Sequence, residues 1–361
     1  MLALALAAGC SGADAGRVDL AKACPATVVV QTDWFPGPEW GALYQLMLDG
    51  GGAIAVDDQG ASGPLGKTGV RLAVKAGGPA LGGESVASRM YADQSILLGA
   101  VSTGQAVGES ADLAVVGVVS PLDASPRALM WDPATVPATD LAGLGALGDR
   151  VRVVYADGDD GFDVLASKGL VKRRQLDASS DGSDTTFTSE SGIAQEVMAT
   201  GDPYTYQHEL AAWRKPVRFE LLDRSGYRPY PALAVRADAL DAQAACLSGL
   251  VPLIQRAQAD YLADPGAVNA RMPELSKPFA DFRPVSAAAA DDAVAQVKAL
   301  GLAGAGTVGD FDEARVAKVV ADALPAIKQA DPVAGLAAVK PGVGAGDLVT
   351  NRFIDTKITL G

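Results

Sequence analysis

The chain has 361 residues, of which 49% are apolar and 20% are charged, which is enough apolar material for about two packed domains and argues against global disorder. Acidic residues outnumber basic residues 43 to 30, and the resulting net charge of -13 repels the phosphates of nucleic acids and anionic membrane surfaces. One histidine and three cysteines exclude most zinc enzymes, because zinc sites draw three or four ligands from these residue types. We therefore expect no nucleic-acid partner, no metal and no cofactor.

The first ten residues are apolar and small, and they end in Leu6-Ala7-Ala8-Gly9-Cys10. This run is too short to span a bilayer, which takes about 20 apolar residues, but it has the length of the apolar part of a secretion signal. Small residues before a cysteine resemble a bacterial lipobox, in which Cys10 is lipidated and becomes the mature N-terminus. No lysine or arginine precedes the run, and Ala7 stands where leucine is usual, so an ordinary secreted protein is the alternative. Residues 1–23 are interpreted as signal, lipobox and spacer.

Cys24 and Cys246 are then the two thiols of the mature chain. Outside the cytoplasm an even number of cysteines favours a disulfide. Two separate buried thiols are the alternative that the sequence leaves open.

The chain continues as an α/β series. Residues 26–33 are an apolar, β-branched run of strand length, and residues 39–48 have a helical pattern that opens after Pro36-Gly37-Pro38. The loop between them lies at a strand-to-helix turn, where open α/β sheets bind their ligands. Pro121 and Pro126 interrupt the chain, and a new α/β series follows. Further strands or apolar runs are expected at residues 53–56, 70–76, 113–119, 127–131, 151–155, 217–222 and 232–235, and helices at 162–168, at 191–200 and repeatedly after 238.

Several motifs are rejected on their context. Residues 61–68 match a relaxed phosphate-binding loop, but that loop needs a helix beginning at Lys67-Thr68, and a strand is expected there instead. The aspartate-rich stretches 157–163 and 177–184 lack the spacing and the final glutamate of a calcium loop. No Gly-x-Ser-x-Gly elbow is present, and His208 has no nucleophile signature nearby, so we interpret it as a surface histidine.

The stretch Gln-Thr-Asp-Trp-Phe-Pro-Gly-Pro-Glu-Trp-Gly-Ala-Leu-Tyr at residues 31–44 resembles a family of solute-binding lipoproteins. These belong to ABC importers of the nitrate, sulfonate, taurine and thiamine-pyrimidine-precursor class, and the resemblance is to an actinobacterial-like subgroup. The resemblance covers about residues 24–270, with a weaker match at 350–355. Further matching stretches follow in order at residues 76–80, 90–93, 125–131, 202–204, 215–217, 226–231 and 246–252.

The resemblance implies a two-lobed α/β structure of the periplasmic-binding-protein type II fold, whose chain crosses twice between the lobes and closes a cleft by hinge motion. It places lobe I in residues 24–123 and 225–361, the second part mostly helical, and lobe II in residues 124–224. The chain departs from its apparent relatives, which commonly carry Glu at the position of Gly37, His at that of Trp40, and Tyr-Asp-Gly-Ser at residues 180–183. These positions lie in loops expected at the cleft, so the resemblance leaves the ligand open.

The expected ligand-binding residues lie in and beside these loops: Asp33, Trp34, Phe35, Glu39, Trp40, Tyr44, Gly78, Pro79, Asp181, Asp202 and Tyr204. Aromatic faces would stack on a ring, and the acids would accept hydrogen bonds from ring nitrogens or amines. Alternatively, Trp34 and Phe35 belong to the core, Glu39 only complements a helix dipole, and Asp202 only forms a turn. An oxyanion would want an arginine cluster, which these loops lack. The sequence therefore favours a neutral or cationic heteroaromatic ligand.

The expected function is that of a solute-binding protein and not of an enzyme. The resemblance implies a monomer outside the cytoplasm, anchored by lipid to the outer face of the membrane or secreted, with an ABC permease and its ATPase as partners. Two alternatives remain. One is a pyrimidine-synthesising enzyme of the same fold family, which needs an iron-binding histidine and a cysteine-rich motif. The other is a tethered extracellular sensor or interaction module without a transported solute.

Overall fold

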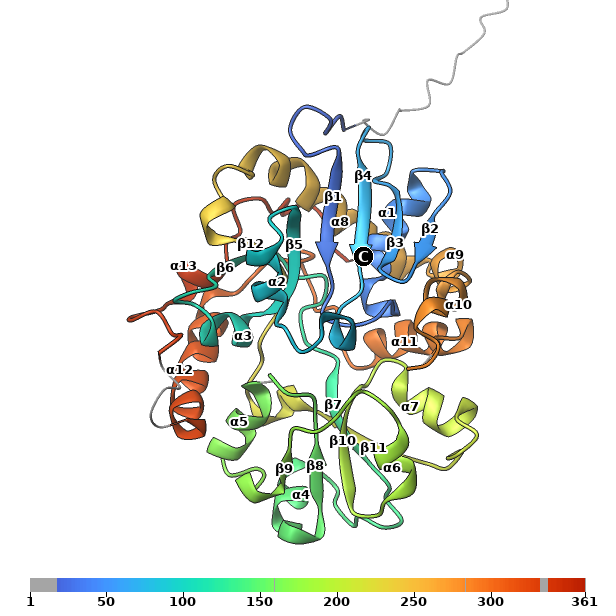
Figure 1. Cartoon of the computed structure of the whole chain (residues 1–361), viewed down its shortest axis with the longest axis vertical. Helices are drawn as coiled ribbons and strands as arrows, with labels where there is room; N and C mark the ends of the chain where they lie inside the picture. Colours follow the sequence, from blue (N-terminus) through green and yellow to red (C-terminus); the bar gives the residue numbers. More distant parts are fainter. Residues whose placement is uncertain (1–17, 159, 283, 332–336, 361) are drawn as a thin grey trace, which may run out of the picture.

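The computed structural model describes residues 18–158, 160–282, 284–331 and 337–360. Cys10, the predicted lipidation site, lies outside these residues. Two separate β-sheets organise the described chain, one in the upper and one in the lower half of the molecule in Figure 1. We call the larger sheet with its helices lobe I and the smaller sheet with its helices lobe II. The two-lobed α/β fold predicted from the sequence is thus present.

The sheet of lobe I has the strand order β2-β3-β4-β1-β5-β12-β6. Strand β1 is parallel to both β4 and β5, whereas β12 is antiparallel to its neighbours β5 and β6. Every residue of β6 is buried, as expected for a strand covered by helices on both faces. The strands are β1 (Thr27–Gln31), β2 (Ala55–Asp57), β3 (Gly60–Pro64), β4 (Arg71–Lys75), β5 (Ile96–Ser102), β6 (Val115–Val119) and β12 (Pro231–Arg236).

The sheet of lobe II has the order β11-β7-β10-β8-β9. Its strands are β7 (Arg127–Trp131), β8 (Arg152–Val154), β9 (Leu176–Asp177), β10 (Ile193–Met198) and β11 (Arg218–Leu221). The helices of both lobes are α1 (Gly41–Asp49), α2 (Val86–Ala92), α3 (Thr103–Gly108), α4 (Leu141–Leu147), α5 (Asp160–Ser167), α6 (Thr185–Ser189), α7 (Asp202–Tyr204), α8 (Ala244–Ala263), α9 (Gly266–Asn269), α10 (Met272–Leu275), α11 (Ala287–Ala299), α12 (Glu313–Ala330) and α13 (Ala345–Leu348).

One predicted element has the wrong type. Residues 191–200 were expected to form a helix, but they contain β10, which pairs with β7 on one side and β8 on the other. Gln195, Glu196 and Met198 favour a helix locally, yet the strand is held by neighbours that are distant in the sequence. The central strand β5 was not predicted at all. In contrast, β4 follows the loop at residues 65–70, so the rejected phosphate-binding motif has no helix after it.

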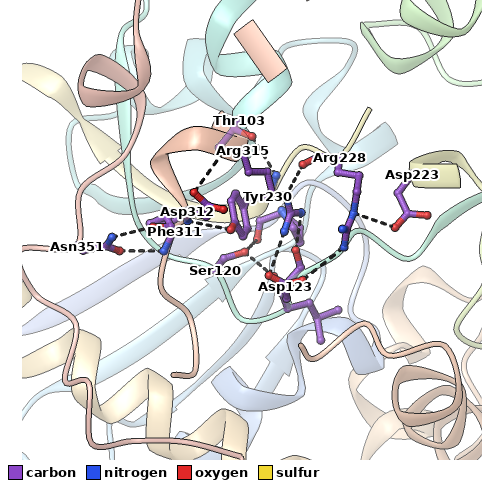
Figure 2. A network of polar contacts seen from close by, with 12 residues as sticks. Thr103, Ser120, Asp123, Asp223, Arg228, Tyr230, Phe311, Asp312, Arg315 and Asn351 are labelled. Carbon is purple, nitrogen blue, oxygen red and sulfur yellow. Dashed lines mark hydrogen bonds and ion pairs between the residues drawn. The ribbon is translucent and has the colours of Figure 1, made fainter. Parts of the chain in front are cut away.

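The chain passes between the lobes after β6 and again after β11, and a network centred on Arg315 joins the two crossovers (Figure 2). Arg315, in the first turn of α12, donates to the carboxylate of Asp123 at 3.0 Å and to its backbone oxygen at 2.6 Å. It also donates to the backbone oxygen of Arg228 at 2.7 Å and stacks 3.7 Å from the ring centre of Tyr230. Both crossovers are therefore attached to one helix of lobe I.

Two further contacts tie distant segments together. Cys24, before β1, forms a disulfide with the buried Cys246 of α8 across a sequence separation of 222 residues. Helix α12 also packs on α5 of lobe II, where Val164 is buried against it and Lys168 pairs with Asp322 at 2.9 Å. Lobe II is thus held to lobe I beside the crossovers as well as through them.

Candidate functional site

A cavity that is open to solvent lies between the two lobes. Lobe I contributes the loop after β1, the end of β5 and the start of β12. The first crossover contributes prolines and Leu122. Lobe II contributes the start of β7 and the end of β10. The lining residues are Asp33, Glu39, Trp40, Ala100, Val101, Ser102, Gln105, Pro121, Leu122, Ser125, Pro126, Arg127, Met198, Pro231 and Ala232.

Asp33 is positioned by the polar residues at the end of β1. The side-chain amide of Gln31 donates to the backbone oxygen of Ala76 at 2.9 Å, and the hydroxyl of Thr32 lies 2.7 Å from the backbone oxygen of Trp34. Asp33 is exposed to solvent at the open side of the cavity. The protein packed around its carboxyl group nevertheless raises the pKa of Asp33 to about 6, although the positive charge of Arg127 lowers it. At neutral pH Asp33 therefore offers the cavity a carboxylate acceptor.

Glu39 lies in a short 3-10 helix, Pro38–Trp40, that precedes α1. Burial raises the pKa of Glu39 to about 8, and the negative charges of Asp33 and Asp202 contribute to the increase. At neutral pH this carboxyl group mostly keeps its proton and can donate a hydrogen bond. A Cβ atom at residue 37 would lie 2.4 Å from Oε1 of Glu39, so Gly37 leaves the space that this carboxyl group occupies.

Lobe II supplies a charged pair to the same cavity. Arg127 begins β7, and its Nε donates to Oε1 of Glu196 on β10 at 2.8 Å. The other carboxylate oxygen of Glu196 accepts from the backbone N–H of Ala156 at 2.9 Å. The side chains of Arg127 and Glu196 are 24% and 12% exposed, so solvent screens their attraction only weakly. Arg127 thus borders the cavity while held by an acid from its own lobe.

Three of the predicted residues, Asp33, Glu39 and Trp40, line the cavity. Trp40 is buried, and its indole N–H has no hydrogen-bond partner within the described residues. Tyr44 does not line the cavity, because it lies in the core of lobe I with its hydroxyl group sealed from solvent. Phe35 does not line the cavity either, because it packs against Phe279 and Phe282, with ring centres 5.0 and 4.7 Å away.

Trp34 lies between the lobes instead of lining the cavity. A Cβ atom at Gly78 would lie 2.5 Å from its ring atom Cε3, and one at Gly182 would lie 2.6 Å from Cζ2, so the indole rests on the backbone of both. The predicted residues Pro79 and Asp181 are the chain neighbours of these glycines. The loops at residues 78–79 and 181–182 therefore meet at Trp34.

Asp202 and Tyr204 lie near the cavity without lining it. The carboxylate of Asp202 accepts from the backbone N–H of Met198 at 2.8 Å, and its charge reaches Glu39. The ring of Tyr204 contacts that of His208 in a tilted arrangement, with ring centres 4.7 Å apart, and His208 is exposed, as predicted.

Sequence reasoning missed the polar residues of the cavity on β5, α3 and β7. Ser102 and Gln105 form a capping box, in which the serine hydroxyl accepts from the backbone N–H of Gln105 at 3.1 Å and the glutamine oxygen accepts from that of Ser102 at 3.2 Å. Ser102 ends an apolar run and Gln105 follows three residues later, so the capping-box pattern could have found both. Arg127 was part of a matching stretch but was not assigned to the site.

The described residues include no helix with the length and apolar character that a membrane span requires. No group of three or more histidine, cysteine, aspartate or glutamate side chains in these ranges is arranged to hold a metal ion.

Comparison with known proteins supports the fold through structure alone. No protein-family model matches the chain, and no curated protein matches its sequence. Among solved structures, the periplasmic aliphatic sulphonate binding protein SsuA from Escherichia coli has a TM-score of 0.55 and 13% identity, over 86% of this chain and 89% of that one. The periplasmic nitrate-binding protein NrtA from Synechocystis PCC 6803 has a TM-score of 0.53 and 9% identity, over 91% and 87%.

A Candida albicans protein described as having the generic periplasmic binding protein fold is also similar, with a TM-score of 0.51 and 10% identity over 92% of this chain and 98% of that one. All three likenesses extend over most of both chains. The fold predicted from the sequence is confirmed: this chain has the periplasmic binding protein fold, with two mixed α/β lobes and a cavity between them.

Proposed function

We propose that this protein is the solute-binding component of an ABC importer and captures a small molecule in the cavity between its lobes. The observation that carries the proposal is the composition of that cavity, to which both lobes and the first crossover contribute residues. A ligand seated there would contact both lobes at once, so its binding energy would favour the closed arrangement over an open one. Similar structures are described as periplasmic sulphonate- and nitrate-binding proteins and, from Staphylococcus aureus, as the ligand-binding component of an ABC-type import system, which supports the same role here.

The chemistry of the cavity favours a planar heterocycle that carries hydrogen-bond donors. Asp33 offers a carboxylate, Glu39 a protonated carboxyl group, and Trp40 the edge or face of a ring. Leu122 and Met198 supply apolar surface around these polar groups. A neutral or cationic ring with amine or ring N–H groups would match this set.

An oxyanion fits the cavity less well. Within the described part of the chain, Arg127 is the one arginine that lines the cavity; it is paired with Glu196, and Asp33 adds a second negative charge nearby. The N-terminal N–H groups of α3 are partly occupied by the capping box of Ser102 and Gln105. We therefore propose a different ligand class from the sulphonate and nitrate named for the similar structures.

The remaining parts of the proposal follow from the expected importer role. The protein acts outside the cytoplasm as a monomer, delivers its ligand to an ABC permease driven by an ATPase, and needs no cofactor and performs no catalysis. Cys10 carries a lipid that holds the protein at the outer face of the membrane. The lobes divide at residues 24–123, 124–224 and 225–361.

Calorimetric titration of purified protein tests the ligand class. We expect 4-aminopyrimidine or benzamidine, both planar donors, to bind, and methanesulfonate and nitrate not to bind. Asp33→Asn should weaken donor binding about ten- to hundredfold, because a hydrogen bond to a charged group is worth about 1.5 to 3 kcal/mol. Asp58→Asn makes the same charge change at an exposed residue of lobe I and serves as the control. Binding of the anions in preference to the donors would contradict the proposal.

A further inference from the structure

Arg127 is a cation at the wall of a cavity whose other charged residues are acids. In a fold that also holds proteins described as sulphonate- and nitrate-binding, such an arginine is the kind of donor an oxyanion needs. Here Glu196 already accepts its hydrogen bonds. We infer that Glu196 is the specificity-determining residue that excludes anionic ligands, by holding Arg127 in an ion pair that an anion would have to break. This inference rests on the proposed solute-binding function.

The strand pairing places the two side chains together. In the antiparallel pair of β7 and β10, Arg127 is opposite Met198, and Glu196 is opposite Leu129. Side chains two residues apart on a strand share a face, so Glu196 is the diagonal neighbour of Arg127. Met198, also on this face, lines the cavity beside Arg127. The position of the pair is therefore fixed by the sheet and does not depend on a flexible loop.

Glu196 is held from two sides. Oε1 accepts from both Nε and Nη2 of Arg127, and Oε2 accepts from the backbone N–H of Ala156, which follows β8. An acid fixed in this way cannot turn aside when a ligand enters. The pair is also largely shielded from solvent, so removing one partner leaves the other charge poorly compensated.

The charge balance of the cavity follows from these residues. With Asp33 and Glu196 ionised, Arg127 positive and Glu39 protonated, the cavity has a net charge of about -1 near neutral pH. Glu196 and Arg127 both act on Asp33, since the negative charge of Glu196 raises its pKa and the positive charge of Arg127 lowers it. Among these four residues, removing the charge of Glu196 would bring the sum to neutrality and leave Arg127 as the one full positive charge.

The substitution Glu196→Gln makes this change with little change of shape. The glutamine amide oxygen can still accept from Ala156, and its NH₂ group cannot accept from Arg127. The guanidinium then loses its carboxylate acceptor on β10, so an anionic ligand no longer competes with Glu196 for it. Glu190→Gln is the matched control, because Glu190 pairs with Arg152 in the same lobe and is 53% exposed.

Calorimetry with methanesulfonate and benzamidine as probes tests the inference. We expect Glu196→Gln to bind methanesulfonate at least about tenfold more tightly than the wild type, as expected for a gained charge-assisted hydrogen bond. Glu190→Gln should behave like the wild type. The double variant Arg127→Gln/Glu196→Gln should lose the gain, which shows that the gain acts through Arg127.

The inference would be overturned if Glu196→Gln gains no affinity for methanesulfonate although it is folded, with wild-type circular dichroism and a cooperative thermal transition. A gain that persists without Arg127 would also overturn it. If Glu196→Gln does not fold, Glu196→Ala, which also removes the charge beside Arg127, must show the gain instead. Failure of benzamidine to bind the wild type would count against a donor-bearing planar ligand alone, because the methanesulfonate comparison is independent of it.

Discussion

Glu39 should make the protein less stable as the pH rises, and Glu39→Gln should remove that loss. Burial raises the pKa of this carboxyl group from the ordinary 4.5 to about 8. Between these values the folded protein keeps a proton that the unfolded chain has released, so the free energy of unfolding falls with increasing pH. The stabilisation from protonated Glu39 is complete below pH 4.5 and is lost as the pH rises through 8.

The size of the effect follows from the same two values. One pKa unit corresponds to about 1.36 kcal/mol, so at pH 7, which is 2.5 units above 4.5, the loss is about 3 kcal/mol. Glutamine resembles the protonated acid in shape and hydrogen bonding but does not titrate. We therefore expect Glu39→Gln to match the wild type near pH 4.5 and to be more stable by about 3 kcal/mol at pH 7.

Urea unfolding at pH 4.5, 6, 7 and 8.5 measures this difference. The exposed Glu190→Gln serves as a control that removes an acid outside the cavity, and its effect should change little over the same range. A Glu39→Gln difference that is constant with pH, or one that decreases as the pH rises, would refute the assignment of a buried, protonated acid at this position.

Three other changes have defined outcomes. Arg315→Ala removes two hydrogen bonds to backbone oxygens, and at about 1.5 kcal/mol each this loss should lower the free energy of unfolding by about 3 kcal/mol. The control Arg174→Ala, at an exposed ion pair, should change it by less than about 0.5 kcal/mol. Urea titrations measure both values. Reduction of the disulfide between Cys24 and Cys246 should destabilise the protein by up to about 5 kcal/mol, and thiol titration of the unfolded, unreduced protein should find neither sulfur free. Gly182→Val should displace the indole of Trp34 and increase iodide quenching of tryptophan fluorescence, while Gly158→Val, at a glycine with no atom near its Cβ position, should not.

The sequence predicted most elements that depend on local patterns. The apolar, β-branched run of β1 predicted a strand, and the helical spacing of Leu247, Leu250 and Ile254 predicted helix α8. Both predictions hold because the buried residues of each element lie close together in the sequence. Strand β10 was predicted as a helix, since its pairing with β7 and β8 depends on residues up to 71 positions away in the sequence.

The residues that line the cavity were predicted only where one loop supplies them. Asp33, Glu39 and Trp40 follow a recognisable strand, and all three line the cavity. Trp34 and Phe35 come from the same loop, but neither lines the cavity. Trp34 packs against Gly182 of lobe II, and Phe35 packs against Phe279. Arg127 and Glu196 could not be paired from the sequence, since 69 positions separate them and only the β7–β10 register brings them together.

The central claim is that a donor-bearing small molecule binds between the lobes at Asp33. Its most direct test is mass spectrometry of the small molecules retained by purified protein after incubation with a bacterial metabolite extract, washing and denaturation. We expect the wild type to retain a nitrogen heterocycle with amine or ring N–H groups. Asp58→Asn should retain it in a near-equal amount, and Asp33→Asn should not retain it. Retention of an anion, equal retention by Asp33→Asn, or retention of no compound by the wild type would contradict it.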